Sequence, residues 1–179
     1  MATLKEQYSA KAVPALKESF KIGNILDIPK IQKVTLNIGI NAKQDAKFAD
    51  VAVDTLRRIS GQEPVKTKAR KSEAGFKIRK GMVVGAMVTM RGQRMWDFLT
   101  KLVAITFPRI RDFRGISESA IDGSGNFNFG FGEHIAFPEI SANEVEFIHG
   151  LQVTITTSAI NREQGLALFR ALGFPFKKN

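Results

Sequence analysis

Apolar residues are spaced along the chain in two ways, and the spacing predicts which segments are helices and which are strands. The N-terminal segment has an apolar residue at every fourth position, which is typical of an amphipathic helix: Leu4, Tyr8, Ala12, Leu16 and Phe20. Pro14 is expected to bend this helix or to start a second short one. Residues 45–60 and 93–106 have the same helical spacing, ended by Gly61 and followed by Pro108. In the helix of residues 93–106, the residues expected to face the core are Met95, Phe98, Leu99, Leu102 and Ile105.

Four further segments alternate between apolar and polar residues, the pattern of a strand with one buried face. They are residues 31–40, 65–70, 84–91 and 151–158. A last helix is expected after Asn161, whose side chain can cap it, with Gln164 three residues on. Gly173 and Pro175 stand where this helix would end.

The inner elements follow the order β-α-β-β-α-β, which is typical of the split β-α-β fold. The sequence therefore predicts a two-layer α+β fold, ferredoxin-like or RRM-like, with an antiparallel sheet and helices on one of its faces. An N-terminal helix precedes this core. Residues 107–150 form an insertion, in which the glycine- and phenylalanine-rich residues 123–132 predict a hairpin. We expect residues 1–179 to form a single domain, with a mobile loop at residues 71–81.

Composition limits the classes of protein that remain. A chain of 179 residues that is 44% hydrophobic can bury a core without cross-links. It contains no cysteine, which excludes disulfides and thiolate sites and fits a reducing compartment. No apolar run reaches the length of a membrane span, and the N-terminus lacks a signal-peptide core. We therefore expect a cytosolic protein without a membrane partner.

The charge is unevenly distributed along the chain. There are 27 Lys and Arg residues against 17 Asp and Glu residues, a net charge of +10. Residues 115–179 hold four basic and seven acidic residues, which leaves 23 basic and ten acidic residues in residues 1–114. Such a surplus favours a polyanionic partner, nucleic acid first, and the asymmetry suggests two different partner surfaces.

Catalysis has little support in the sequence. The glycines of residues 123–132 do not have the G-x-G-x-x-G spacing, and residues 75–81 do not form a Walker loop. His134 and His149 lack the neighbouring ligands of a zinc site, and we expect both to be ordinary surface or interface histidines. No acid–base pair lies in the basic region. The sequence predicts no enzyme activity, no cofactor, no metal site and no small-molecule substrate.

The sheet face away from the helices is the candidate RNA surface. By alternation it would display lysines, arginines, threonines and an asparagine: Lys33, Thr35, Asn37, Lys66, Lys68, Arg70, Met87, Thr89, Arg91, Thr154 and Thr156. A solvated sheet face with the same residue types is the alternative. RRM domains stack bases on sheet aromatics, and this face has none. We therefore expect contacts to phosphates, 2′-hydroxyls and minor-groove edges of a folded RNA.

Six short motifs resemble, in order, the bacterial large-subunit ribosomal protein five family, the 5S-RNA-binding protein of the central protuberance. They are VTLNIG at 34–39, TKARKS at 67–72, AGFKIR at 74–79, PRIRDFRG at 108–115, FPEI at 137–140 and TITT at 154–157. The closing FPFK at 174–177 extends the resemblance over nearly the whole chain. Three residues depart from the pattern of the family: Glu73 adds an acid where the loop is usually apolar or basic, Met87 stands where a basic residue is common, and Asn41 replaces a usual glycine.

The resemblance implies a structural protein with four kinds of partner: 5S rRNA, 23S rRNA, peptidyl-site (P-site) tRNA and a small-subunit protein. Residues implied or predicted to bind 5S rRNA are Lys33, Thr35, Asn37, Gln62, Lys66, Lys68, Arg70, Thr89 and Arg91. Those implied to contact P-site tRNA are Lys71, Ser72, Ala74, Gly75, Phe76, Lys77, Arg79 and Lys80. Those assigned to the intersubunit bridge are Arg109, Arg111, Glu139, Glu144 and Glu146. The alternatives are an architectural RNA- or DNA-binding module outside the ribosome and, less favoured, a phosphate-ester enzyme.

Overall fold

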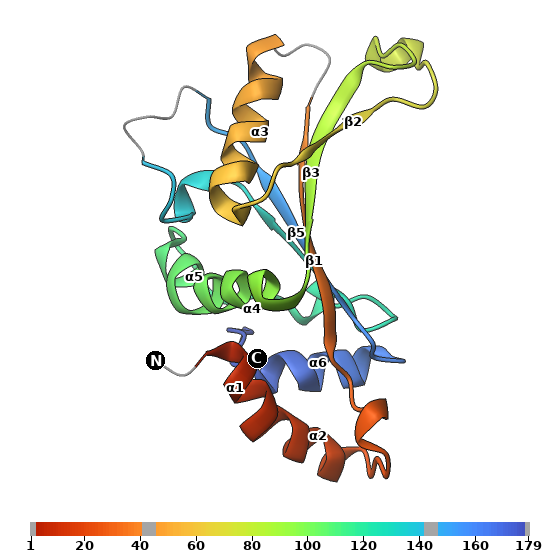
Figure 1. The fold of residues 1–179 in the computed structure, drawn as a ribbon, viewed down its shortest axis with the longest axis vertical. Helices are drawn as coiled ribbons and strands as arrows, with labels where there is room; N and C mark the ends of the chain where they lie inside the picture. The colour runs from red at the N-terminus through yellow and green to blue at the C-terminus, as the bar shows by residue number, and fades with distance from the viewer. Residues whose placement is uncertain (1–2, 41–45, 142–146, 178–179) are drawn as a thin grey trace. The chain divides into compact units, whose positions relative to one another are not determined.

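A computed structural model describes residues 3–40, 46–141 and 147–177, and its elements are labelled in Figure 1. Five strands form one antiparallel sheet in the order β2-β3-β1-β5-β4. The strands are β1 (Ile31–Gly39), β2 (Val65–Lys68), β3 (Val83–Met90), β4 (Phe127–Phe131) and β5 (Leu151–Thr157). The helices are α1 (Leu4–Gln7), α2 (Val13–Ser19), α3 (Ala46–Ser60), α4 (Gly92–Lys101), α5 (Phe107–Arg109) and α6 (Arg162–Ala171). The predicted α+β fold of the split β-α-β kind is confirmed.

The chain divides into two compact units. Unit 1 comprises residues 1–34, 90–129 and 154–179, and unit 2 comprises residues 35–89 and 130–153. The division falls inside strands β1, β4 and β5 and at the end of β3. The expectation of a single domain stays a prediction.

In unit 1, two helices contain a π-helical turn, and each turn shifts the side-chain positions that follow it. Residues Tyr8–Ala12 connect α1 to α2, and the turn ends just before Pro14, which has no backbone N–H to donate. Residues Leu102–Thr106 connect α4 to α5. Because this turn adds one residue to the helical period, Thr106 is buried and Ile105 is 44% exposed. The prediction that Ile105 faces the core is therefore wrong.

The core of unit 1 is rich in phenylalanine. Phe127, Phe169 and Phe174 lie with ring centroids 5.0 to 5.3 Å apart, and Phe107 joins them at 6.0 Å from Phe174. Such tilted and edge-on ring contacts add to the free energy of burying the rings. Helix α6 begins as predicted, because Asn161 Oδ1 accepts the Gln164 backbone N–H at 2.9 Å.

The glycine-rich part of the insertion forms a tight turn that immediately precedes β4 in the sequence. Asp122 Oδ1 accepts the backbone N–H groups of Ser124 and Asn126 at 3.0 and 2.8 Å. Gly125 has φ 76°, and a Cβ on Gly165 would lie 2.5 Å from its Cα. Two glycines therefore meet where no larger residue fits. The predicted hairpin of residues 123–132 is a turn followed by a strand that joins the sheet next to β5.

In unit 2, helix α3 covers one face of the strands and leaves the other face open. Phe48, Ala52, Leu56 and Ile59 are buried on α3, as the helical spacing predicts. On the strands, Leu36, Ile38, Ala86 and Val88 are buried, whereas the residues between them remain accessible. The alternation of β1 and β3 thus gives unit 2 a buried face and an open face, as predicted.

Candidate nucleic-acid interface

The open face of unit 2 presents a row of neutral polar groups from three neighbouring strands. Thr35 Oγ1 on β1 lies 3.5 Å from Thr89 Oγ1 on β3, and either hydroxyl can donate to the other. A Cβ added to Gly85 would lie 2.8 Å from Thr67 Oγ1 on β2 and 3.9 Å from Asn37 Oδ1 on β1. Glycine at this position therefore lets the Thr67 hydroxyl approach the centre of the face. We call these five residues, Thr35, Asn37, Thr67, Gly85 and Thr89, the open-face cluster.

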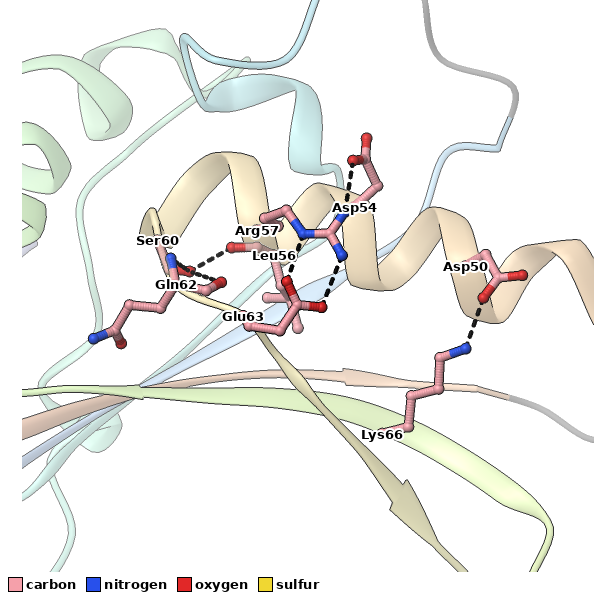
Figure 2. A network of polar contacts seen from close by, with 8 residues as sticks. All are labelled: Asp50, Asp54, Leu56, Arg57, Ser60, Gln62, Glu63 and Lys66. Atoms are coloured by element: carbon pink, nitrogen blue, oxygen red, sulfur yellow. Dashed lines mark hydrogen bonds and ion pairs between the residues drawn. The ribbon is translucent and has the colours of Figure 1, made fainter.

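The sequence assigned Lys66 of β2 to the wrong face. Lys66 pairs with Ala86, which is 0% exposed on the helix-covered face, and Thr67 pairs with Gly85 on the open face. Paired residues point to the same side of a sheet, so the prediction that Lys66 lies on the open face is wrong. The Lys66 ammonium instead reaches Asp50 on α3, with Nζ 2.7 Å from Oδ1 (Figure 2). Thr67 was missing from the predicted RNA surface because the alternation of β2 placed it on the face covered by the helix.

The remaining cations of this region lie at the ends of the strands. A register shift after Thr67 pairs Lys68 with Val83, and Lys68 and Arg70 are both exposed. Lys33 is half-exposed on β1 and Arg91 is exposed at the start of α4, but both belong to unit 1. The structure thus brings three of the predicted residues, Thr35, Asn37 and Thr89, together and leaves the predicted cations outside the cluster.

The turn after α3 presents Gln62. Gly61 has φ 65°, which reverses the chain, and Ser60 Oγ accepts the Gln62 backbone N–H at 3.2 Å. Arg57 and Glu63 form a two-bonded ion pair beside the turn (Figure 2). The hydrogen bonds from Arg57 lower the pKa of the Glu63 carboxyl, so the pair is charged at neutral pH.

The loop of residues 71–81 forms an internally bonded tip at the end of the β2–β3 pair (Figure 1). Glu73 and Ile78 exchange both backbone hydrogen bonds at 2.9 and 3.1 Å, and Lys77 between them adopts φ 56°. Phe76 is 71% exposed. Only Ile78 in this loop is more than superficially covered, so the loop buries little core, and its mobility stays a prediction. Exposed residues of the tip include Lys71, Ser72, Ala74, Gly75, Lys77, Arg79 and Lys80.

The predicted bridge residues come from different parts of the chain. Arg109 and Arg111 are exposed in unit 1, where Phe113 stacks on Phe107 at 5.6 Å and fixes the loop that follows α5. Glu139 is half-buried in unit 2. Glu144 and Glu146 lie outside the described residues.

The two histidines are not surface residues, so that prediction is wrong. His134 and His149 are 2% and 7% exposed and stack with ring centroids 3.9 Å apart. The His149 backbone N–H donates to His134 Nδ1 at 3.3 Å, and Thr55 Oγ1 lies 3.3 Å from His149 Nε2. Burial lowers the pKa of both imidazoles. Nothing in their spacing of fifteen residues signals this contact.

Neither a metal site nor a membrane span is found in the described part of the chain. Residues 3–40, 46–141 and 147–177 contain no group of three or more His, Asp or Glu side chains placed to hold a metal ion. No described helix is both long and apolar enough to cross a membrane.

A strongly cationic α+β chain with an open polar sheet face has the features of an RNA-binding protein. Comparison with known families narrows this class. The family described as "Ribosomal protein L5" matches residues 24–79, and the family that describes the C-terminus of the same ribosomal proteins matches residues 83–176.

Three of the relatives that match nearly the whole chain are each a large ribosomal subunit protein uL5. The protein of Francisella tularensis subsp. mediasiatica is 51% identical over 178 residues, which cover 99% of both chains. That of Halothermothrix orenii is 48% identical over 179 residues, covering 99% of this chain and all of the relative. That of Chloroflexus aurantiacus is 50% identical over 175 residues, 97% of each chain. The chain belongs to the uL5 family of large-subunit ribosomal proteins, which in bacteria are cytoplasmic as part of the ribosome.

Proposed function

We propose that this chain, as a structural constituent of the large ribosomal subunit, binds 5S rRNA through the open face of unit 2. The open-face cluster is the observation that carries the proposal. It places three hydroxyl groups and one carboxamide on adjacent strands, and no helix of unit 2 covers them.

The chemistry of this face suits a folded RNA. Hydroxyl and carboxamide groups can donate to and accept from 2′-hydroxyls and base edges, and they add no charge of their own. Strands β1, β2 and β3 contain no aromatic residue, so the face offers no platform on which to stack an unpaired base. Lys68 and Arg70 lie beyond the cluster, where phosphates of the same RNA can pair with them. Neutral groups would therefore select the RNA and the flanking cations would strengthen its binding.

Two further contacts complete the proposed role. The tip of residues 71–81 contacts P-site tRNA, because it combines Lys71, Lys77, Arg79 and Lys80 with the exposed Phe76 ring. Arg109 and Arg111 in unit 1, and separately the acidic residues Glu139, Glu144 and Glu146, contribute to a bridge with a small-subunit protein. Lys33 and Arg91 in unit 1 are further proposed contacts of 5S rRNA, and other exposed cations of the chain are available to 23S rRNA.

Filter binding tests the first part of the proposal directly. The full chain is titrated with 5S rRNA, with poly-U and with duplex DNA at one physiological salt concentration, because RNA affinities are comparable only at equal salt. Selective binding of 5S rRNA supports the proposal. Equal affinity for 5S rRNA and poly-U would reduce the interaction to non-specific attraction between charges.

A further inference from the structure

The turn after α3 holds the Gln62 backbone between two anchors. On one side, Ser60 Oγ donates to Leu56 O at 2.6 Å and accepts the Gln62 N–H at 3.2 Å. On the other side, Arg57 donates twice to the Glu63 carboxylate, from Nε to Oε2 at 2.8 Å and from Nη2 to Oε1 at 2.7 Å. A guanidinium that binds both carboxylate oxygens fixes their relative orientation, which a single hydrogen bond does not. The residue that precedes Glu63 is therefore held in place at both ends (Figure 2).

Arg57 is itself held by α3. Its Nη1 lies 3.7 Å from Asp54 Oδ1, and the other oxygen of Asp54 accepts Arg58 Nε at 2.8 Å. The guanidinium of Arg57 thus faces two carboxylates, and Lys66 is paired with Asp50 further along the same helix. Cations on this side of α3 are consequently neutralised by neighbouring acids, which leaves them less available to phosphate.

Gln62 itself is directed away from these ion pairs. Figure 2 shows its side chain extending from the turn on the side opposite Arg57 and Glu63. Among the residues that the structure describes, its carboxamide makes no hydrogen bond, and the residue is half-buried. A carboxamide has two donor hydrogens and an acceptor oxygen, the set that reads a base edge or a 2′-hydroxyl.

We infer that the ion pair of Arg57 with Glu63 positions Gln62 for RNA, so that an acidic residue strengthens binding to a polyanion. The inference rests on the proposed function, because Gln62 acts only where 5S rRNA is the ligand. Glu63 is a positioning residue and needs no contact with the RNA. It fixes the turn and keeps the Arg57 guanidinium from turning toward a phosphate.

If only charge mattered, Glu63 would weaken the binding of RNA. A carboxylate near a polyanion is repulsive, so its removal would tighten binding and would free Arg57 to pair with a phosphate. If the ion pair positions Gln62, removal of Glu63 instead loosens the turn and weakens binding. The sign of the change in affinity on Glu63→Ala therefore separates the two accounts.

The experiment measures the affinity of the full chain for 5S rRNA across a range of salt concentrations. We expect Gln62→Ala to weaken binding about three- to tenfold, the effect of one lost hydrogen bond, and Glu63→Ala to weaken it by a similar factor. The double variant is expected to be no weaker than either single variant, because Glu63 acts through Gln62. The exchanged pair, Arg57→Glu with Glu63→Arg, restores an ion pair across the turn at unchanged net charge but places a carboxylate at position 57 beside Asp54, so it is expected to recover part of the affinity that Glu63→Ala loses.

Glu18→Ala is the matched control. Glu18 is exposed on α2, and its loss changes the net charge by the same amount without touching the turn. We expect it to leave the affinity unchanged or slightly tighter. Urea midpoints establish that each variant is folded, and an exposed ion pair contributes little to them.

Each other outcome overturns the inference. Binding that tightens with Glu63→Ala, with a slope of log affinity against log salt steeper by up to about one unit, would identify Arg57 as a freed phosphate ligand. If Glu63→Ala weakens binding by the same factor in the wild type and in the Gln62→Ala variant, Glu63 does not act through Gln62. If the wild type binds 5S rRNA and Gln62→Ala changes nothing, this inference fails and the proposed function stands. If the wild type itself does not select 5S rRNA, both fail.

Discussion

Lys66 on β2 is paired with Asp50 on α3, with Nζ 2.7 Å from Oδ1, on the side of the sheet that the helix covers. The two cations nearest to it in β2 and the following turn, Lys68 and Arg70, are exposed instead. Three basic residues at alternate positions in the sequence therefore have different surroundings in the structure.

The salt dependence of 5S rRNA binding should reflect this difference. Lys68→Ala and Arg70→Ala are each expected to flatten the slope of log affinity against log salt by up to about one unit, because each removes a phosphate contact. Lys66→Ala is expected to leave the slope nearly unchanged, because its charge is already balanced by Asp50. A slope that flattens equally for all three would show that the ion pair with Asp50 opens when RNA binds.

This comparison also shows how far the sequence predicts the site. Alternation assigned β1 and β3 correctly, because Leu36 and Ile38 give β1 one unambiguous apolar face. In β2, Val65 and Thr67 suggested a buried face, yet they lie on the open side, and Val65 is 63% exposed. A four-residue edge strand has too few apolar side chains to fix its own orientation, so pairing with β3 decides it.

Two other features could not be predicted, one because the helical period changes and one because it is a contact between residues far apart in the sequence. The π-helical turn before Thr106 moves Ile105 out of the core, and helical spacing read from the sequence assumes a constant period. The contact between His134 and His149 joins two segments that carry no shared pattern. The cap at Asn161 and the turn at Gly61, in contrast, are local and were predicted correctly.

Gly85→Ala should destabilise unit 2. The new Cβ would lie 2.8 Å from Thr67 Oγ1 and 2.9 Å from the Ile38 carbonyl oxygen, and the carbonyl belongs to the backbone of β1. We expect the free energy of unfolding to fall by about 1–3 kcal/mol, as for other overpacked sites. Urea denaturation measures it, with Gly39→Ala as the control, since a Cβ there meets no atom within 4 Å. Equal stability of the two variants would mean that β1 and β3 can separate locally without cost.

The buried histidines should make stability depend on pH. Burial lowers the pKa of His134 and His149 in the folded chain below the ordinary value of about 6.5. Between the lowered pKa and about 6.5 the unfolded chain binds more protons, so the free energy of unfolding falls as the pH falls through this window. An NMR titration of the imidazoles checks the premise directly. A midpoint at or above 6.5 for both rings would contradict it.

Shortening residues 71–81 to a two-residue Asn-Gly turn should separate two of the proposed contacts. The tip makes its backbone hydrogen bonds mainly within itself and buries little core, so we expect unchanged urea midpoints and nearly unchanged 5S rRNA affinity. Retention of P-site tRNA on ribosomes that carry the shortened chain is expected to fall. Lost 5S rRNA binding would instead place the tip inside the 5S rRNA site.

The most direct test of the central claim is the affinity for 5S rRNA of a double variant of the open-face cluster, Asn37→Ala with Thr89→Val. Both substitutions remove neutral hydrogen-bonding groups and leave the net charge at +10. The account predicts affinity for 5S rRNA reduced by about tenfold or more, an unchanged salt slope, and unchanged affinity for poly-U. Wild-type affinity for 5S rRNA in this folded variant would contradict the claim that the open face binds the RNA.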